Sequence, residues 1–128
     1  MKKLFMLLIL ALVVALAAPV MAEEVTQSFG QVTGTGSYIY VSTGYTPRYI
    51  ETNTASPAQA VWQYGMAASA CLKTVAMDAS GSLTSYVAIA TPCLKTYAGS
   101  TASPPGFMIG IDSDLFPVGS IIYWRTVR

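Results

Sequence analysis

The fold is decided by the stretch from Ser37 to Asn53, which has the sequence SYIYVSTGYTPRYIETN. Two runs rich in β-branched and aromatic residues, 37–42 and 48–53, flank a segment that contains Gly44 and Pro47. Such runs are typical of β-strands, and a proline at this position pre-sets the backbone for a turn. The stretch therefore predicts two short strands joined by a tight connection.

Similar runs continue toward the C-terminus. The sequence predicts further strands over 60–64, 72–77, 83–90, 107–111 and 120–127, with hairpin chemistry in the DASGS segment at 78–82. No segment after residue 22 combines helical spacing of apolar residues with capping signals at both ends. About eight short strands predict an all-β domain over residues 37–128, either an antiparallel β-sandwich or a small barrel.

The segment 23–36 precedes this domain and differs from it in composition. It holds Gly30, Gly34 and Gly36 and few large apolar residues. Glycine weakens a strand because it has no side chain to pack, and chain ends are often poorly ordered. We expect a flexible glycine-rich arm that can add a strand to a neighbouring molecule.

Residues 1–22 have the features of a secretory signal peptide. Lys2 and Lys3 precede an apolar run over 4–18, and Pro19 and a small-residue site ending at Ala22 follow. The sequence therefore predicts a helical signal peptide that is cleaved after Ala22, which exports the protein to a secreted, periplasmic or cell-surface location. The alternative is an uncleaved membrane anchor, for which the apolar run is short.

Removal of this segment changes the charge. The chain has seven basic and six acidic residues, so loss of Lys2 and Lys3 leaves five against six, a net charge near −1. A chain without a basic patch is not expected to bind nucleic acid. Low surface charge favours association with copies of the same chain, although a monomer with an uncharged polar surface remains the alternative.

The residue types present restrict the chemistry. The sequence has no histidine, which removes the commonest general base and the commonest metal ligand. Asp112 and Asp114 are the one close carboxylate pair, and a turn is favoured over a Ca²⁺ site because Ca²⁺ needs six to eight oxygen ligands. Glu51 and Asp78 are a weak candidate for an acid–base pair. The sequence predicts no catalytic, cofactor-binding or metal-binding residues.

Cys71 and Cys93 are the two cysteines, and each begins the sequence CLKT. The repetition could place them at similar positions on two strands, and in an oxidising compartment an even cysteine count predicts a disulfide. Two buried free thiols are the alternative.

Four aromatic residues are candidates for a binding surface or an interface. They are Trp62, Tyr64, Tyr86 and Trp124, which all fall in or next to predicted strands. Aromatic residues in strands usually pack in the core or against a neighbouring strand, and this alternative applies above all to the two tryptophans.

Three short motifs follow one another in the order GYTPR at 44–48, WQYGM at 62–66 and GFMIG at 106–110. In this order they resemble motifs of small β-sandwich structural proteins of tailed bacteriophages, which serve as virion or decoration proteins. The resemblance extends from Gly44 to Arg125. It implies a non-enzymatic module without catalytic residues that assembles with its own copies or docks on a larger particle.

The signal peptide and the two cysteines depart from that family, whose members assemble in the cytoplasm. Both a cellular and a viral origin therefore stay open. The sequence leads to the hypothesis of an exported structural or assembly module that self-associates or docks on a surface assembly. The alternative is a secreted carbohydrate-binding or adhesin-like β-sandwich that uses exposed aromatic residues.

Overall fold

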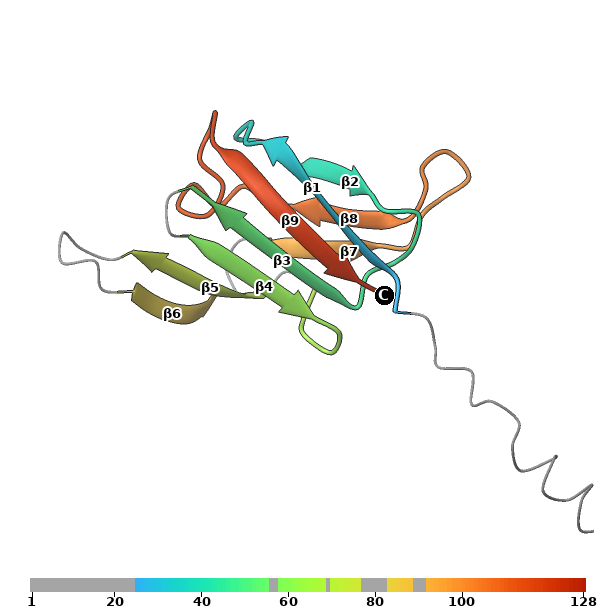
Figure 1. The fold of residues 1–128 in the computed structure, drawn as a ribbon, viewed down its shortest axis with the longest axis horizontal. Helices are drawn as coiled ribbons and strands as arrows, with labels where there is room; N and C mark the ends of the chain where they lie inside the picture. Colours follow the sequence, from blue (N-terminus) through green and yellow to red (C-terminus); the bar gives the residue numbers. More distant parts are fainter. Residues whose placement is uncertain (1–24, 56–57, 69, 77–82, 89–91) are drawn as a thin grey trace, which may run out of the picture.

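A computed structural model describes residues 25–55, 58–68, 70–76, 83–88 and 92–128, and at 75–76 and 83–88 it describes the backbone alone. The expected signal peptide and the predicted turn at 78–82 lie outside these residues. The described chain contains no helix and forms antiparallel strands in two sheets, so the prediction of an all-β fold is confirmed (Figure 1).

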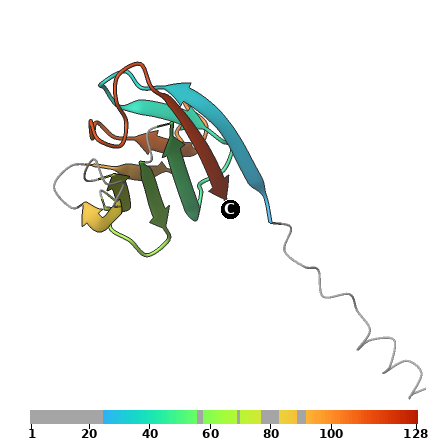
Figure 2. The same ribbon diagram turned by 60° about the vertical axis from the view of Figure 1, so that its left-hand side comes forward.

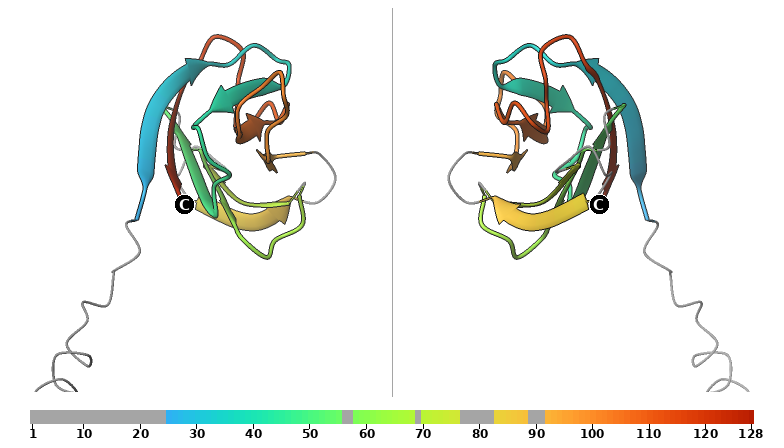
Figure 3. Two further views of the ribbon diagram at one scale, coloured as in Figure 1. Left: turned by 90° about the vertical axis from the view of Figure 1, so that its right-hand side faces the viewer. Right: turned by 90° about the vertical axis from the view of Figure 1, so that its left-hand side faces the viewer.

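The large sheet has six strands. Their spatial order is β1 (Gln27–Thr33), β9 (Ile121–Val127), β3 (Tyr49–Thr54), β4 (Gln59–Gln63), β5 (Cys71–Ala76) and β6 (Leu83–Ala88). The small sheet has three strands, in the order β2 (Ile39–Ser42), β8 (Gly106–Ile109) and β7 (Leu94–Tyr97). Figure 3 shows the large sheet curving around the small one, so that the two enclose a single core.

The expectation of a flexible arm over 23–36 is wrong for Gln27–Thr33. These residues form β1, which pairs with β9 along its whole length. Gly30 lies opposite Trp124, and a Cβ atom at Gly30 would lie 2.6 Å from Cζ2 of that ring. The glycine is therefore required for close packing, because it leaves room for the tryptophan ring across the strand.

Strand β7 could not be assigned from its own residues, and only the repeated CLKT sequence at 93–96 pointed to a strand there. It pairs with β8, and its first residue, Leu94, is fully buried. Four residues are too few to show a clear alternation of apolar and polar side chains. The pairing with β8, on the side opposite β2, is what defines this strand.

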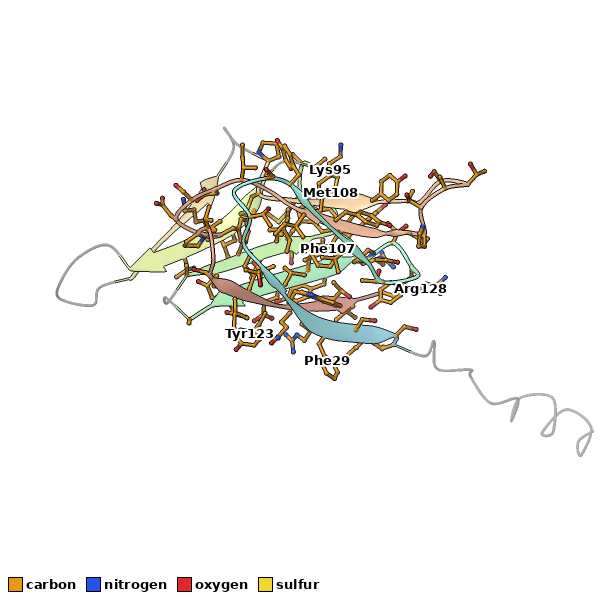
Figure 4. All side chains as sticks on the ribbon, turned by 90° about the horizontal axis from the view of Figure 1, so that it is seen from above. Phe29, Lys95, Phe107, Met108, Tyr123 and Arg128 are labelled. Atoms are coloured by element: carbon orange, nitrogen blue, oxygen red, sulfur yellow. A yellow bond between two sulfur atoms is a disulfide. The ribbon has the colours of Figure 1, made fainter. Side chains whose placement is uncertain are left out.

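The core lies between the two sheets. Phe107 of β8 is fully buried at its centre (Figure 4), and its ring meets Trp124 edge to face at a centroid distance of 5.6 Å. The other large, fully buried apolar side chains come from both sheets and from the β8–β9 connection, and they are Ile50, Leu94, Ile109, Leu115 and Ile122. Their burial supplies the main driving force for folding.

A disulfide between Cys71 and Cys93 joins the two sheets. Both residues are fully buried, and their Cα atoms lie 5.8 Å apart. Cys71 begins β5 in the large sheet, and Cys93 directly precedes β7 in the small sheet. The predicted disulfide is confirmed, and each CLKT segment contributes to a strand, although Cys71 lies within its strand and Cys93 lies one residue before its own.

Candidate functional site: an open sheet edge and an aromatic groove

The four aromatic candidates do not form one surface. Trp62 and Tyr64 lie together at the end of β4, whereas Trp124 lies on β9 against Phe107. The side chain of Tyr86 lies outside the described part of the chain. Trp62 is 5% exposed and belongs to the core, while Tyr64 is 72% exposed. Of the described candidates, Tyr64 is therefore the one best placed to meet a ligand.

Tyr64 stands at an open groove with a volume of about 500 Å³. Arg48, from the turn before β3, lines the groove. The groove is also lined by residues from the end of β4, from the loop that follows it and from β7, which are Trp62, Tyr64, Met66 and Thr96. Gly65 has a φ of 98°, a left-handed conformation that favours glycine and turns the chain directly after Tyr64. The Trp62 indole N–H donates to the Ala67 carbonyl oxygen at 3.2 Å, so this donor is already used within the protein.

Arg48 supplies the charge of the groove. Its guanidinium carbon lies 4.9 Å from the centre of the Tyr64 ring, and the Tyr64 N–H donates to the Arg48 carbonyl oxygen at 2.7 Å. Among the described residues, no carboxylate forms an ion pair with Arg48. The groove therefore combines an exposed aromatic ring with a guanidinium whose charge is free to attract an anionic group.

A second candidate site is the outer edge of the large sheet. Strand β1 pairs with β9 on one side, and no other described strand pairs with its opposite side (Figures 1 and 2). The segment QSFGQVT contains neither a charged residue nor a proline. Edge strands usually carry such residues because they prevent pairing with other molecules. Strand β1 has no such protection.

The hydrogen bonds that flank β1 show which of its backbone groups are unused. The Gly34 N–H donates to Ser120 O at 2.8 Å, and the Arg128 N–H donates to Thr26 O at 3.0 Å. Hydrogen-bonded pairs alternate along an antiparallel ladder, so Ser28, Gly30 and Val32 also bond to β9. The other residues of β1 direct their N–H and C=O groups away from β9, and they are Gln27, Phe29, Gln31 and Thr33.

Three exposed apolar side chains lie on the outer face beside this edge, together with the charged Arg125, which stands opposite Phe29. Phe29 is 83% exposed, and Ile121 and Tyr123 of the neighbouring strand β9 are each nearly half exposed. Figure 4 shows Phe29 and Tyr123 on the outer side of the large sheet, opposite the side that holds Phe107. Exposed apolar side chains that are grouped in this way mark interaction surfaces more often than scattered ones do.

Glu51 lies on the same outer face, opposite Arg125 in the cross-strand row that begins with Phe29, and takes part in a network of hydrogen bonds. Its Oε2 accepts from Arg125 Nη2 at 2.7 Å and from Tyr49 Oη at 3.0 Å, and its Oε1 accepts from Asn53 and Gln59. Burial raises the pKa of Glu51, but the hydrogen bonds from Asn53, Tyr49 and Arg125 and the charge of Arg125 outweigh this, so the net pKa is lowered. Both oxygens are occupied by partners that hold the carboxylate in its charged form.

This network leads to a pH-dependent stability. The pKa of Glu51 is lower in the folded than in the unfolded chain. The stability that the charged carboxylate adds to the fold is therefore fully present above the ordinary glutamate pKa. The contribution is lost as the pH falls through the lowered value. We expect Glu51→Gln to reduce the melting temperature at neutral pH and to leave it close to wild type in strong acid. Thermal unfolding across this pH range measures the difference, and a constant gap between the two proteins would contradict the expectation.

The Asp112–Asp114 segment forms the turn that the sequence favoured over a Ca²⁺ site. Asp112 Oδ1 accepts the backbone N–H groups of Asp114 and Leu115 at 3.0 and 3.1 Å. Both carboxylates also contact the ammonium group of Lys73. Within the described residues, no group of three or more His, Cys, Asp or Glu side chains is arranged to hold a metal ion.

Comparison with known proteins gives no relative. No protein-family description, curated protein or solved structure matches the chain. The resemblance to phage structural proteins therefore stays a prediction. In the part of the chain that the structure describes, no helix is sufficiently long and apolar to span a bilayer.

Proposed function

We propose that the protein is an exported, non-enzymatic structural module that self-associates by pairing the β1 edges of two copies. The observation that carries this proposal is the edge of β1 that no described strand covers, which presents N–H and C=O groups without a charge or a proline to block a second strand. The disulfide supports an exported location, because such bonds persist in oxidising compartments.

An antiparallel arrangement uses the whole edge. With the two copies centred on Gly30, all seven residues of β1 have a partner, and Phe29 of one copy lies opposite Gln31 of the other. The unused backbone groups of both strands then face each other. The two Phe29 rings become diagonal neighbours, a spacing at which aromatic side chains are within reach. Pairing therefore covers the most exposed aromatic side chain of the described chain.

Gln31→Pro tests the pairing without removing a hydrogen bond inside the monomer. The Gln31 N–H points away from β9, so proline at this position removes a donor that only a second copy uses. We expect the chain from Glu23, which contains every described residue, to form dimers or larger assemblies in light scattering. We expect the proline variant to be monomeric at the same concentration.

Gln31→Thr is the matched control, because threonine keeps the N–H and favours strands. It should associate like wild type. A wild-type protein that is monomeric at high concentration, or a proline variant that remains folded and associates normally, would rule out pairing through β1.

A second candidate function rests on the groove beside Tyr64. An exposed aromatic ring next to a guanidinium that no described carboxylate pairs with suits a sugar residue that carries a carboxylate, because the ring covers an apolar sugar face and the guanidinium binds the acid. This supports the carbohydrate-binding alternative. It does not require association of the protein with itself.

Tyr64→Ala is the appropriate test of this candidate, since Tyr64 is exposed and its removal leaves the core intact. Trp62→Ala would confuse binding with folding, because that side chain is buried. On an array of acidic and neutral glycans, we expect wild type to bind uronic-acid-containing chains and the Tyr64→Ala protein to lose this binding. An array on which wild type binds no acidic glycan would exclude the candidate.

A further inference from the structure

The side chain of Lys73 lies inside the domain. It is 3% exposed, and it belongs to the inner face of β5 together with the fully buried Cys71 two residues earlier. Its register partner in β4 is Ala60, which is also fully buried. Lysine is almost never buried to this extent without a specific partner. The stem of the Lys73 side chain therefore lies beside the apolar, fully buried Cys71 and Ala60.

Two carboxylates meet this amino group. Lys73 Nζ lies 2.7 Å from Asp112 Oδ2 and 2.9 Å from Asp112 Oδ1, and it lies 2.9 Å from Asp114 Oδ2. The Asp112 side chain is 13% exposed, whereas that of Asp114 is 66% exposed. One carboxylate is thus held inside against the amine, and the other connects the cluster with solvent.

We propose that this cluster is self-reactive, and that Lys73 and Asp112 condense to an intramolecular isopeptide bond between Nζ and Cγ. The reaction needs no metal, oxidant or cofactor. It is a single event in each molecule, so it does not require a high rate.

The step balances as a dehydration. One proton passes from the Lys73 ammonium to Asp112 Oδ2, which gives a neutral amine and a neutral acid. Nζ then attacks Cγ, and Asp114 takes a second proton from Nζ and transfers it to Oδ2. The C–Oδ2 bond breaks and water leaves, while the third proton stays on the new amide and Asp114 ends as the carboxylate that it was at the start.

Three features of the site favour this reaction. The amine and the carboxyl group are held in contact, which replaces a bimolecular encounter by an intramolecular one. The two backbone N–H groups at Asp112 Oδ1 are placed to stabilise the negative charge that develops there when Nζ attacks. Burial of the Lys73 side chain and of most of the Asp112 side chain limits the access of water, which would reverse the condensation.

The bond would tie β5 of the large sheet to the β8–β9 connection. Cys71, on the same face of β5, already ties that strand to the segment before β7. The same strand would then carry two covalent links to different parts of the domain, and the second would resist reducing agents. The cross-link does not depend on association through β1, so either proposal can fail alone.

The intact mass of the chain from Glu23, measured after reduction and denaturation, tests the proposal. We expect a mass lower than the sequence mass by one water molecule. In a tryptic digest, we expect Lys73 to resist cleavage and residues 49–95 to be joined to residues 96–125. A full sequence mass, with separate peptides that end at Lys73 and Arg125, would overturn the proposal.

Variants distinguish the cross-link from other reactions that also lose one water molecule, such as succinimide formation at Asp112-Ser113. Lys73→Arg keeps a positive charge beside the carboxylates but removes the nucleophilic amine, so its mass should equal its sequence mass. Asp114→Ala should leave most molecules unlinked, and Asp114→Glu should restore the link. A loss of water that persists in Lys73→Arg would show a succinimide and would contradict the isopeptide bond.

Discussion

Phe107→Ala is expected to lower the free energy of unfolding by about 4 kcal/mol, since large-to-small substitutions of buried phenylalanine have costs of this size. Phe107 is fully buried between the sheets, and its ring packs against Trp124. The cavity would lie where β2, β8 and the large sheet meet, so no single loop can move to fill it. Urea denaturation followed by tryptophan fluorescence measures the change.

Phe29→Ala is the matched control, because it removes the same side chain from a position that is 83% exposed. It should change the stability of the monomer little, since surface substitutions usually have small effects. Equal losses for the two substitutions would show that Phe107 is not in the core.

Removal of the disulfide is expected to have the second-largest effect. Cys71→Ala combined with Cys93→Ala should lower the free energy of unfolding by about 3 kcal/mol, because a link across 22 residues restricts the unfolded chain. The bond also joins the two sheets at buried positions. Its loss therefore removes the covalent link between two elements that pack in the same core. Denaturant unfolding of the variant and of wild type gives the difference.

Reducing agent provides the control for this second prediction. It should destabilise wild type to a similar extent and have no effect on the double alanine variant. A wild-type protein that is equally stable with and without reductant would contradict the contribution of the disulfide.

Seven of the strands could be predicted from the sequence, because they combine β-branched and aromatic residues with clear turn signals. The run from Ser37 to Asn53 contains β2 and β3, and the C-terminal run over 120–127 contains β9. Turn chemistry was also informative, since the Asp112–Asp114 segment is a turn whose side-chain oxygen accepts backbone N–H groups.

Strand β1 could not be predicted from the sequence, because its central glycine, Gly30, argues against a strand when the sequence is considered alone. Gly30 indicates flexibility when the chain is considered alone, but in the fold it makes room for Trp124 on the neighbouring strand. The partner is nearly a hundred residues away, and local patterns carry no information about it. The same limitation hid β7, whose short length gave no periodicity.

The candidate sites were only partly visible in the sequence. The aromatic candidates included Tyr64, but nothing local indicated that Arg48 lies over its ring. The preference for core positions describes Trp62 correctly, and it explains why a substitution there would have been a poor test of binding. Phe29 was not singled out, because the absence of charge and proline around it indicates an unprotected edge only once 27–33 is known to be an edge strand.

The most direct test of the central claim, pairing through β1, is amide hydrogen exchange measured residue by residue at increasing protein concentration. The N–H groups of Gly30 and Val32 bond to β9 within one molecule, so they should be protected at every concentration. The N–H groups of Phe29 and Gln31 face the open edge, so they should exchange rapidly in dilute solution and become protected as the protein associates. If the protein associates while Phe29 and Gln31 continue to exchange rapidly, the copies do not pair through β1.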